Sequence, residues 1–315
     1  MNPAAAERFE RDLAPLAPPG TRLGLAVSGG PDSLALLLLA ADMRPGEIEA
    51  VTVDHRLRSG SVLEAQAVAA ICAGRGIPHA MLAARWSEPP TTNLQARARI
   101  ERYELLADWA YTKSLDAVVT AHHADDQAET LLLRLARGSG VAGLGGVRPS
   151  RPLCPGVSLI RPLLGWRRAE LATIVADAAL TPADDPSNRD PRHERARMRA
   201  WLADADWADA ARLAATAACL RDADDALVWT VGSVAEDRLT RSNDGVALDP
   251  AELPRELKRR LLLLAFDALN ASPPNGPDLA RAMASLEAGR TVTLGHLKLE
   301  GGALWRLSPA PKRRA

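Results

Sequence analysis

The chain has 315 residues, of which 47% are hydrophobic and 25% are charged, and its formal net charge is zero. This composition is typical of a globular protein with one large and one smaller domain, and it gives no global argument for nucleic acid binding. The longest apolar run, residues 34–41, is far shorter than the ~20 residues that cross a bilayer, and the N-terminus lacks an apolar signal region, so we expect a cytoplasmic protein without a membrane span.

The first half of the chain alternates apolar runs with segments of helical periodicity. After a short helix at residues 5–17, strands are expected at residues 23–27, 48–54, 76–84 and 116–120, each followed by a helix. This alternation predicts an α/β fold with a doubly wound, mostly parallel sheet. Ligands of such sheets bind beyond the carboxyl ends of the strands. The polar loops that follow these strands should therefore lie on one rim.

The sequence changes character after residue 137. Residues 138–146 are dense in glycine and indicate a flexible loop, and residues 160–164 form a short extended piece. Further helices are expected at residues 167–180, 202–239, 255–270 and up to residue 288, before short strand-like runs. We place a domain boundary near residue 216. It separates residues 1–215 from a smaller, mainly helical C-terminal domain, residues 216–315.

The loop after the first strand has the composition of a phosphate-binding loop. Its residues are Ser28, Gly29, Gly30, Pro31, Asp32 and Ser33. A glycine loop between a strand and a helix presents free backbone N–H groups to a phosphate. There is no Gly-Lys-Ser/Thr for a γ-phosphate and no dinucleotide fingerprint. The alternative is a plain glycine turn with Asp32 as a helix cap.

A second polar stretch follows the fourth strand. It contains two histidines, His122 and His123, and the acidic residues Asp125, Asp126 and Glu129. Carboxylates on the ligand rim suit Mg²⁺ on a triphosphate or a proton from an attacking amine. The plain alternative is that an aspartate stabilises the helix start, and a zinc site at the histidines lacks a third soft ligand. Asp54 and His55, after the second strand, lie where adenine or ribose would bind.

Arginines form the main local concentration of charge. The densest group is Arg189, Arg192, Arg195, Arg197 and Arg199. Guanidinium groups suit phosphate, which makes this segment a candidate RNA-binding site, although a solvated basic face is the alternative. Arg97, Arg99 and Arg102 share one predicted helix, where the same two interpretations apply. The cysteines, Cys72, Cys154 and Cys219, form no Cys-x-x-Cys pair.

Five stretches together resemble one known family. They are residues 28–33, 53–58, 122–144, 161–164 and 185–188 with Arg195. In these stretches the chain resembles the tRNA(Ile)-lysidine synthases, which are ATP pyrophosphatases of the PP-loop superfamily. The resemblance implies an adenine nucleotide alpha hydrolase-like fold and the short form of the family, with one C-terminal domain. The sequence departs from the family pattern at Arg56, where we expect glycine, and at His193 and Ala196.

The resemblance also implies a reaction and its participants. ATP would adenylate the wobble cytidine in the CAU anticodon of tRNA(Ile), and free L-lysine would then attack C2 to give lysidine, AMP and pyrophosphate. Residues 28–33 with Asp54 and His55 would bind ATP, and Asp32, Asp125, Asp126 and Glu129 would be catalytic. Mg²⁺ would bind Asp32 and Asp126. The arginine segment and the C-terminal domain would bind tRNA.

Three other functions stay open at this stage. Another PP-loop enzyme, such as a tRNA thiolase, would need reactive or paired cysteines for its sulfur chemistry. An NAD-forming or glutamine-fed synthetase would not account for the arginine segment. A non-catalytic, nucleotide-binding RNA protein would not need Asp125, Asp126 and Glu129. The oligomeric state is open, with a dimer possible.

Overall fold

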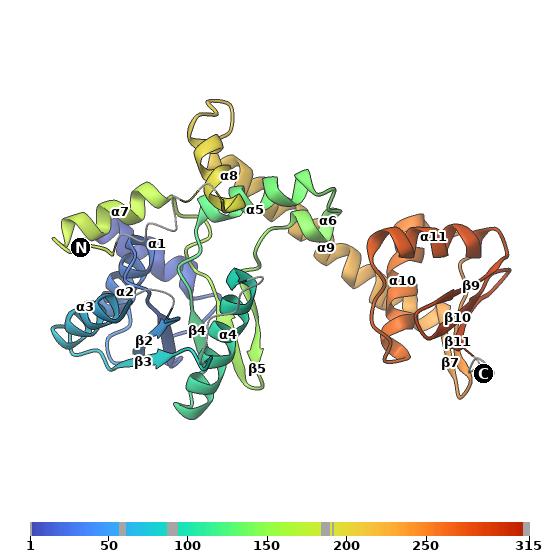
Figure 1. Cartoon of the computed structure of the whole chain (residues 1–315), viewed down its shortest axis with the longest axis horizontal. Coiled ribbons are helices and arrows are strands. Elements are labelled where there is room, and N and C mark those ends of the chain that lie inside the picture. Colours follow the sequence, from blue (N-terminus) through green and yellow to red (C-terminus); the bar gives the residue numbers. More distant parts are fainter. Residues whose placement is uncertain (1, 57–60, 87–93, 184–189, 191, 311–315) are drawn as a thin grey trace. The chain divides into compact units, whose positions relative to one another are not determined.

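The computed structural model describes residues 2–56, 61–86, 94–183, 190 and 192–310. The chain divides into two compact units, Met1–Arg221 and Asp222–Ala315 (Figure 1). The boundary falls within one helix, α9 (Ala210–Arg238). In the described part of the chain, no helix combines the length and the apolar character that spanning a membrane requires.

The first unit is built on a six-stranded sheet in the order β3-β2-β1-β4-β6-β5. All neighbouring strands run parallel except β5, which pairs antiparallel with β6. The predicted α/β fold with a mostly parallel sheet is therefore confirmed. The strands are β1 (Leu23–Ala26), β2 (Ile48–Asp54), β3 (His79–Ala83), β4 (Ala117–Val119), β5 (Ser150–Cys154) and β6 (Val157–Ile160).

Helices cover both faces of this sheet (Figure 1). The helices of the first unit are α1 (Pro3–Leu13), α2 (Pro31–Met43), α3 (Ser61–Ala73), α4 (Leu94–Thr112), α5 (Ala124–Ala136), α6 (Val141–Leu144), α7 (Arg168–Asp177) and α8 (Glu194–Ala203). Of these, α6 and α8 pack against α5. Two expectations were wrong here. The glycine-dense stretch contains the short helix α6, and residues 162–165 form a turn where an extended piece was expected at residues 160–164. The hairpin of β5 and β6 that precedes this turn was not expected. Pro152 is tolerated in β5 because β5 is an edge strand.

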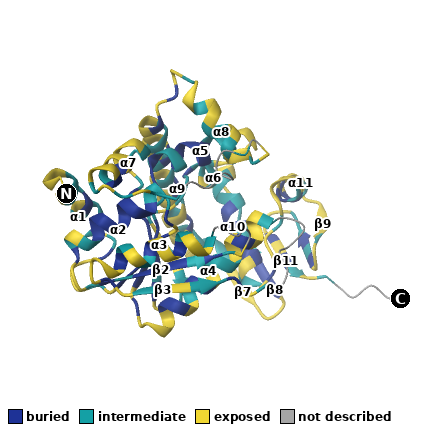
Figure 2. Ribbon diagram, turned by 60° about the vertical axis from the view of Figure 1, so that its left-hand side comes forward, coloured by how far each residue is buried: buried dark blue, intermediate teal, exposed yellow. Residues whose placement is uncertain are grey.

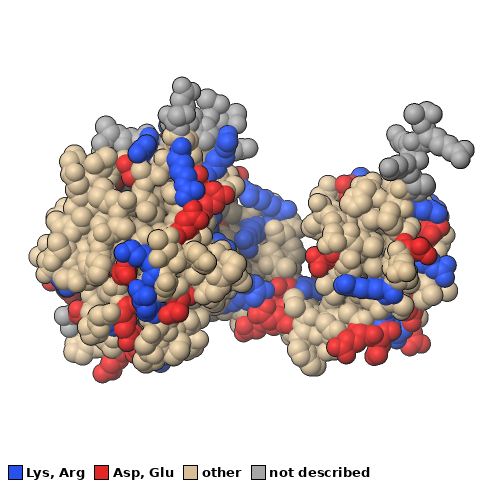
Figure 3. All heavy atoms as spheres, turned by 90° about the horizontal axis from the view of Figure 1, so that it is seen from below, with Lys and Arg blue, Asp and Glu red and all other residues tan. Residues whose placement is uncertain are grey.

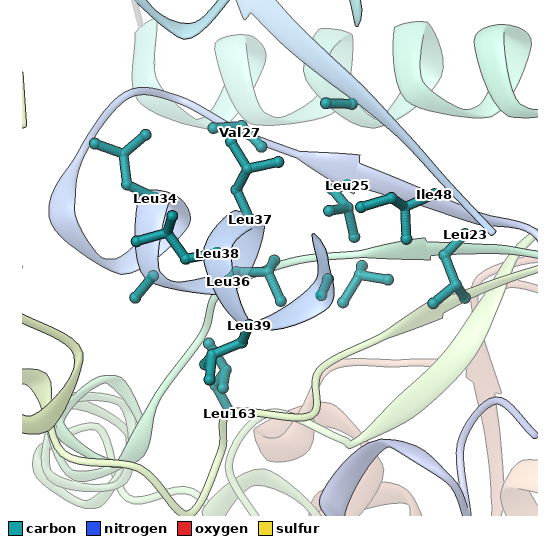
Figure 4. Close-up of a cluster of buried hydrophobic side chains, with 14 of the residues drawn as sticks. Leu23, Leu25, Val27, Leu34, Leu36, Leu37, Leu38, Leu39, Ile48 and Leu163 are labelled. Atoms are coloured by element: carbon teal, nitrogen blue, oxygen red, sulfur yellow. The ribbon is translucent and has the colours of Figure 1, made fainter. Parts of the chain in front are cut away.

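The core of the first unit centres on α2. Leu36, Leu37 and Leu39 of this helix are fully buried, and Figure 4 shows Leu39 beside Leu163. The central strands of the sheet and α2 form the buried interior in Figure 2, whereas the residues of β3 and β5 are half-buried or exposed. A helix that is apolar all round needs contacts on every side, and α2 packs against α1, α7, β1 and β2. This burial fixes the N-terminus of α2 at the carboxyl end of β1.

The second unit pairs helices with a small antiparallel sheet of order β7-β8-β11-β10-β9. The predicted C-terminal helices are present, and the strand-like runs form this sheet. Arg260 and Asp224 are buried together, with Nη2 donating to Oδ1 at 2.6 Å. The elements are α10 (Arg255–Ala268), α11 (Gly276–Glu287), β7 (Leu239–Ser242), β8 (Gly245–Leu248), β9 (Thr291–Leu294), β10 (Leu297–Glu300) and β11 (Trp305–Pro309).

Candidate active site

The loop between β1 and α2 is held by Ser33. The Ser33 hydroxyl accepts a hydrogen bond from the Ser28 amide at 3.1 Å and donates to the Gly30 carbonyl at 3.0 Å. Gly29 has a φ of +86°, in the region that favours glycine. Gly30 is the N-cap and no side chain caps α2, so among the described residues no side chain competes with an anion for its first-turn amides.

The N-termini of α2 and α5 come together at one edge of the sheet. β1 and β4 are parallel neighbours, so the segments that follow them lie side by side. His123 is the N-cap residue of α5, and its ring is only 2% exposed. Its Nε2 atom lies 3.4 Å from Asp32 Oδ2 and 3.7 Å from Asp126 Oδ2, and its Nδ1 atom lies 3.5 Å from Asp125 Oδ2. One buried imidazole thus contacts three carboxylates from two helices.

These contacts hold His123 in its charged form. Burial acts to lower the pKa of His123, but the neighbouring carboxylates of Asp125, Asp32 and Asp126 outweigh it and raise this pKa to about 10. A cation at a helix N-terminus opposes the helix dipole. The three carboxylates offset that cost. His123 is therefore a fixed positive charge between the phosphate loop and α5.

Asp125 is engaged with α7. Its Oδ2 atom accepts the Arg168 amide at 2.9 Å, and both of its oxygens lie 3.3 Å from the Arg167 guanidinium. Burial acts to raise the pKa of Asp125, but His123, the Arg168 amide and Arg167 together hold it far below its usual range. Asp125 therefore anchors the start of α7 and orients His123.

Two carboxylate oxygens at the site are left without a hydrogen-bond partner in the described part of the chain. Among the described residues, neither Asp32 Oδ1 nor Glu129 Oε2, both buried, has a hydrogen-bond partner. Glu129 is 1% exposed, and its Oε1 atom accepts from Arg199 Nε at 2.8 Å. Buried, unsatisfied oxygens are costly unless a ligand or ion completes them. Asp32 and Glu129 thus present acceptors to a bound ligand, whereas Asp126 Oδ2 accepts the His123 amide at 3.1 Å.

The described residues do not form a metal centre from protein ligands alone: no three His, Cys, Asp or Glu side chains are suitably grouped. Mg²⁺ commonly binds one or two carboxylates and takes its other ligands from phosphate and water. The unpartnered Oδ1 of Asp32 fits such a role. The Oδ2 of Asp126 fits it less well, because that oxygen already accepts the His123 amide.

Asp54 and His55 lie at the end of β2, on the same rim as the phosphate loop, because β1 and β2 are parallel neighbours. Asp54 Oδ1 accepts the Arg56 amide at 2.8 Å. The ring of His55 stacks on Trp86 with centroids 6.4 Å apart, and burial followed by the Arg102 charge lowers the pKa of His55. Arg56 has a φ of +53°, which explains why glycine suits this position.

The structure separates the members of the arginine segment. Arg189 lies outside the described residues. Arg199 Nε donates to Glu129 Oε1 in the candidate site, and Arg195 Nη2 donates to Thr130 Oγ1 at 3.2 Å. Arg192 pairs with Asp190, and Arg197 Nη1 donates to the Arg192 carbonyl at 3.3 Å. Basic and acidic groups are interspersed on the face in Figure 3, so positive charge is concentrated only locally.

Three features of this candidate site were not predicted from the sequence. His123 was recognised as part of a polar stretch but not as the residue that three carboxylates surround. Arg199 was expected to bind RNA and Arg167 was not singled out, although Arg199 pairs with Glu129 and Arg167 pairs with Asp125. The sequence did offer one indication of the role of His123: a histidine stands at a helix N-cap, where Ser, Thr, Asp or Asn is usual.

Comparisons with known proteins agree with the resemblance in the sequence. A family model for the PP-loop domain matches residues 1–205. The tRNA(Ile)-lysidine synthase of Novosphingobium aromaticivorans is 47% identical over 99% of this chain and 95% of its own length. That of Zymomonas mobilis is 42% identical over 93% of this chain and 90% of its own length.

One solved structure supports the fold. A U34-tRNA thiolase from Methanococcus maripaludis, described with a 4Fe-4S cluster, aligns with a TM-score of 0.52 and 17% identity, over 64% of this chain and 72% of the thiolase. In this chain Cys72, Cys154 and Cys219 lie on three separate elements, α3, β5 and α9. Because the sequence matches span nearly the whole chain and the PP-loop domain matches its first two thirds, this protein belongs to the tRNA(Ile)-lysidine synthase family.

Proposed function

We propose that the chain ligates lysine to C2 of the wobble cytidine in the CAU anticodon of tRNA(Ile), through an adenylated cytidine. ATP would transfer AMP to the C2 oxygen and release pyrophosphate. The ε-amine of free lysine would then bond to C2, the C2–O bond would break, and AMP would leave with that oxygen. The products are lysidine, AMP and pyrophosphate, which makes the enzyme a ligase that forms a carbon–nitrogen bond.

The observation that carries this proposal is the position of His123 between the two helix N-termini. The first-turn amides of α2 and the buried, protonated ring would face the phosphates of ATP. Preorganised positive groups of this kind stabilise the charge that develops as the bond to pyrophosphate breaks. Residues 28–33 with Asp54 and His55 would hold ATP. When bound, Mg²⁺ would neutralise phosphate charge beside Asp32, with Asp126 as a second candidate ligand.

Glu129 is the carboxylate best placed to bind the lysine amine. Its Oε1 atom is committed to Arg199, and its buried Oε2 atom has no partner among the described residues. An ammonium group would satisfy this oxygen, and a carboxylate can take the proton that the amine loses on attack. Asp126 borders the same cluster. Asp125 would act through His123 and α7, as a positioning residue.

The tRNA would contact the arginine segment, residues 189–199, and the smaller C-terminal domain, residues 216–315. Arg199 of this segment is bound to Glu129. The other arginines are therefore the ones we assign to the tRNA: Arg189, Arg192, Arg195 and Arg197. Guanidinium groups bind phosphates and position RNA without reading its sequence. The wobble base would be turned out of the anticodon loop to reach the rim.

Labelled lysine tests this function. Protein is incubated with ATP, radiolabelled lysine and either tRNA(Ile) or methionine tRNA, which share the CAU anticodon, and acid-stable label on RNA is counted. We expect label on tRNA(Ile) and none on methionine tRNA. ATP cleavage that depends on a sulfide donor, or label from another amine, would reject the proposal. Glu129→Gln should lower lysine incorporation more than it lowers AMP transfer to RNA.

A further inference from the structure

A group of arginines lies beside the active site and takes no part in the chemistry described above. It consists of Arg99, Arg102, Arg151 and Arg161 around the ring of Tyr103, and we call it the Arg161 cluster. Arg99 and Arg102 are on α4, Arg151 is on β5, and Arg161 follows β6. The Cζ atoms of Arg99 and Arg151 lie 5.0 and 4.8 Å from the Tyr103 ring centroid.

The cluster has positive charge without matching negative charge. In the described part of the chain, no carboxylate forms an ion pair with any of its four arginines. Arg161 is 3% exposed, its Nη1 atom donates to the Arg148 carbonyl at 2.6 Å, and its side chain also hydrogen-bonds Tyr103. Its buried Nε atom has no hydrogen-bond partner among the described residues. Burial and the neighbouring guanidinium groups lower the pKa values of Arg102 and Arg161. A buried guanidinium that no carboxylate neutralises is costly, and a bound anion would offset that cost.

The position of the cluster indicates which anion it binds. β4 lies between β1 and β6 in the sheet. The loop after β4 therefore lies between the phosphate loop after β1 and Arg161 after β6. His122, from this middle loop, is close enough to Arg161 and Arg102 for their charges, together with burial, to lower its pKa well below the usual value. A nucleotide held by residues 28–33 would react at the middle loop, which leaves the cluster on the side of the acceptor.

We propose that the Arg161 cluster binds a backbone phosphate of the RNA whose base reacts. This inference rests on the proposed function, since it takes the acceptor to be an RNA base. Forked guanidinium groups suit the oxygens of a phosphodiester. Solvent exposure decreases from Arg99, which is exposed, through Arg102 and Arg151 to Arg161, which is buried. A phosphate could therefore approach Arg161 from the surface along these arginines. Phosphate contacts beside the reacting base would fix its distance from the bound ATP.

A double variant, Arg99→Ala with Arg151→Ala, tests the cluster while leaving the buried Arg161 in place. Arg97→Ala is the matched control, because Arg97 is exposed on the same helix as Arg99. Among the described residues, the arginines whose guanidinium groups lie over the Tyr103 ring are Arg99 and Arg151. Binding of a CAU anticodon stem-loop is measured by fluorescence anisotropy over a range of salt concentrations. Binding of ATP with Mg²⁺ is measured separately by calorimetry, and thermal unfolding confirms that each variant is folded.

At about 0.1 M salt, each lost phosphate contact should raise the Kd for RNA about fivefold and reduce the slope of log K against log salt by about 0.7 to 0.9. ATP affinity should not change, and Arg97→Ala should behave as wild type. Unchanged RNA affinity and slope in the double variant would overturn the inference, as would a loss of ATP binding alone. RNA binding that depends on the cluster without lysine transfer would sustain the inference and reject the proposed ligase. If the double variant still transfers lysine and its KM for RNA is unchanged, the proposed ligase function stands and the inference about the Arg161 cluster is rejected.

Discussion

The Nε2 atom of His123 lies 3.4 Å from the Oδ2 atom of Asp32, and this contact joins the N-termini of α5 and α2. Both residues follow strands that are parallel neighbours, β4 and β1. The buried imidazole carries a positive charge because carboxylates surround it. The same contact leaves Asp32 Oδ1 without a partner among the described residues, and this oxygen is therefore available to a ligand.

The charge on His123 makes stability depend on pH in the alkaline range. Its pKa is raised from 6.5 to about 10, so the proton it binds stabilises the folded state fully below pH 6.5. That contribution is lost as the pH rises through about 10. Wild type should have a larger free energy of unfolding than His123→Gln at neutral pH. We expect this difference between the two proteins to become smaller as the pH rises toward 10. Urea denaturation at several pH values measures it, and a constant difference would contradict a charged His123.

Arg199 should contribute more to stability than Arg195, although both belong to α8. Arg199→Ala leaves the buried Glu129 carboxylate without its charged partner, which we expect to cost about 1–3 kcal/mol because the Arg199 side chain is itself 34% exposed. Arg195→Ala removes one hydrogen bond to Thr130 and should cost less than about 1 kcal/mol. Chemical denaturation compares the two variants. The double variant Arg199→Ala with Glu129→Gln should be more stable than Arg199→Ala alone, because it no longer buries an unpaired carboxylate. Equal losses of stability in Arg199→Ala and Arg195→Ala would contradict a stabilising Arg199–Glu129 ion pair.

Arg56 occupies a backbone conformation that favours glycine, with a φ of +53°. Arg56→Gly should relieve this strain and stabilise the protein by about 0.5–1 kcal/mol, after the greater chain entropy of glycine is included. Arg75→Gly is a suitable control, since Arg75 is exposed and is not among the residues with positive φ. Thermal unfolding should show a higher Tm for Arg56→Gly than for wild type. The control Arg75→Gly should show no such increase in Tm. A lower Tm for Arg56→Gly would mean that the Arg56 side chain contributes more than its backbone costs.

The α/β fold and the phosphate loop were predictable because their signals are local. A short apolar run, two glycines and a run of leucines specify a strand, a loop and a helix without reference to the rest of the chain. The β5–β6 hairpin was missed because both strands are short and one of them, β5, contains Pro152. The Arg199–Glu129 pair joins residues 70 positions apart, and the role of His123 depends on the approach of α2 to α5. Neither leaves a periodic pattern in the sequence.

The three cysteines should differ in reactivity. Cys219 is exposed, whereas Cys72 is buried in the core of the first unit, where burial raises the pKa of its thiol to about 11. In the folded protein a thiol reagent at neutral pH should modify Cys219 first and Cys72 only on unfolding. Cys219→Ser should remove the fast phase. A fast phase that persists in this variant would show that another thiol is accessible.

The central claim is that the site between α2 and α5 places AMP on the RNA base before lysine attacks. It is tested most directly with ATP labelled at the α-phosphate, a CAU anticodon stem-loop of tRNA(Ile) and no lysine. We predict that wild type transfers label to the RNA, that unlabelled lysine then discharges it as AMP, and that Asp32→Ala transfers none. Label that never becomes attached to RNA, or equal labelling by Asp32→Ala, would contradict the account.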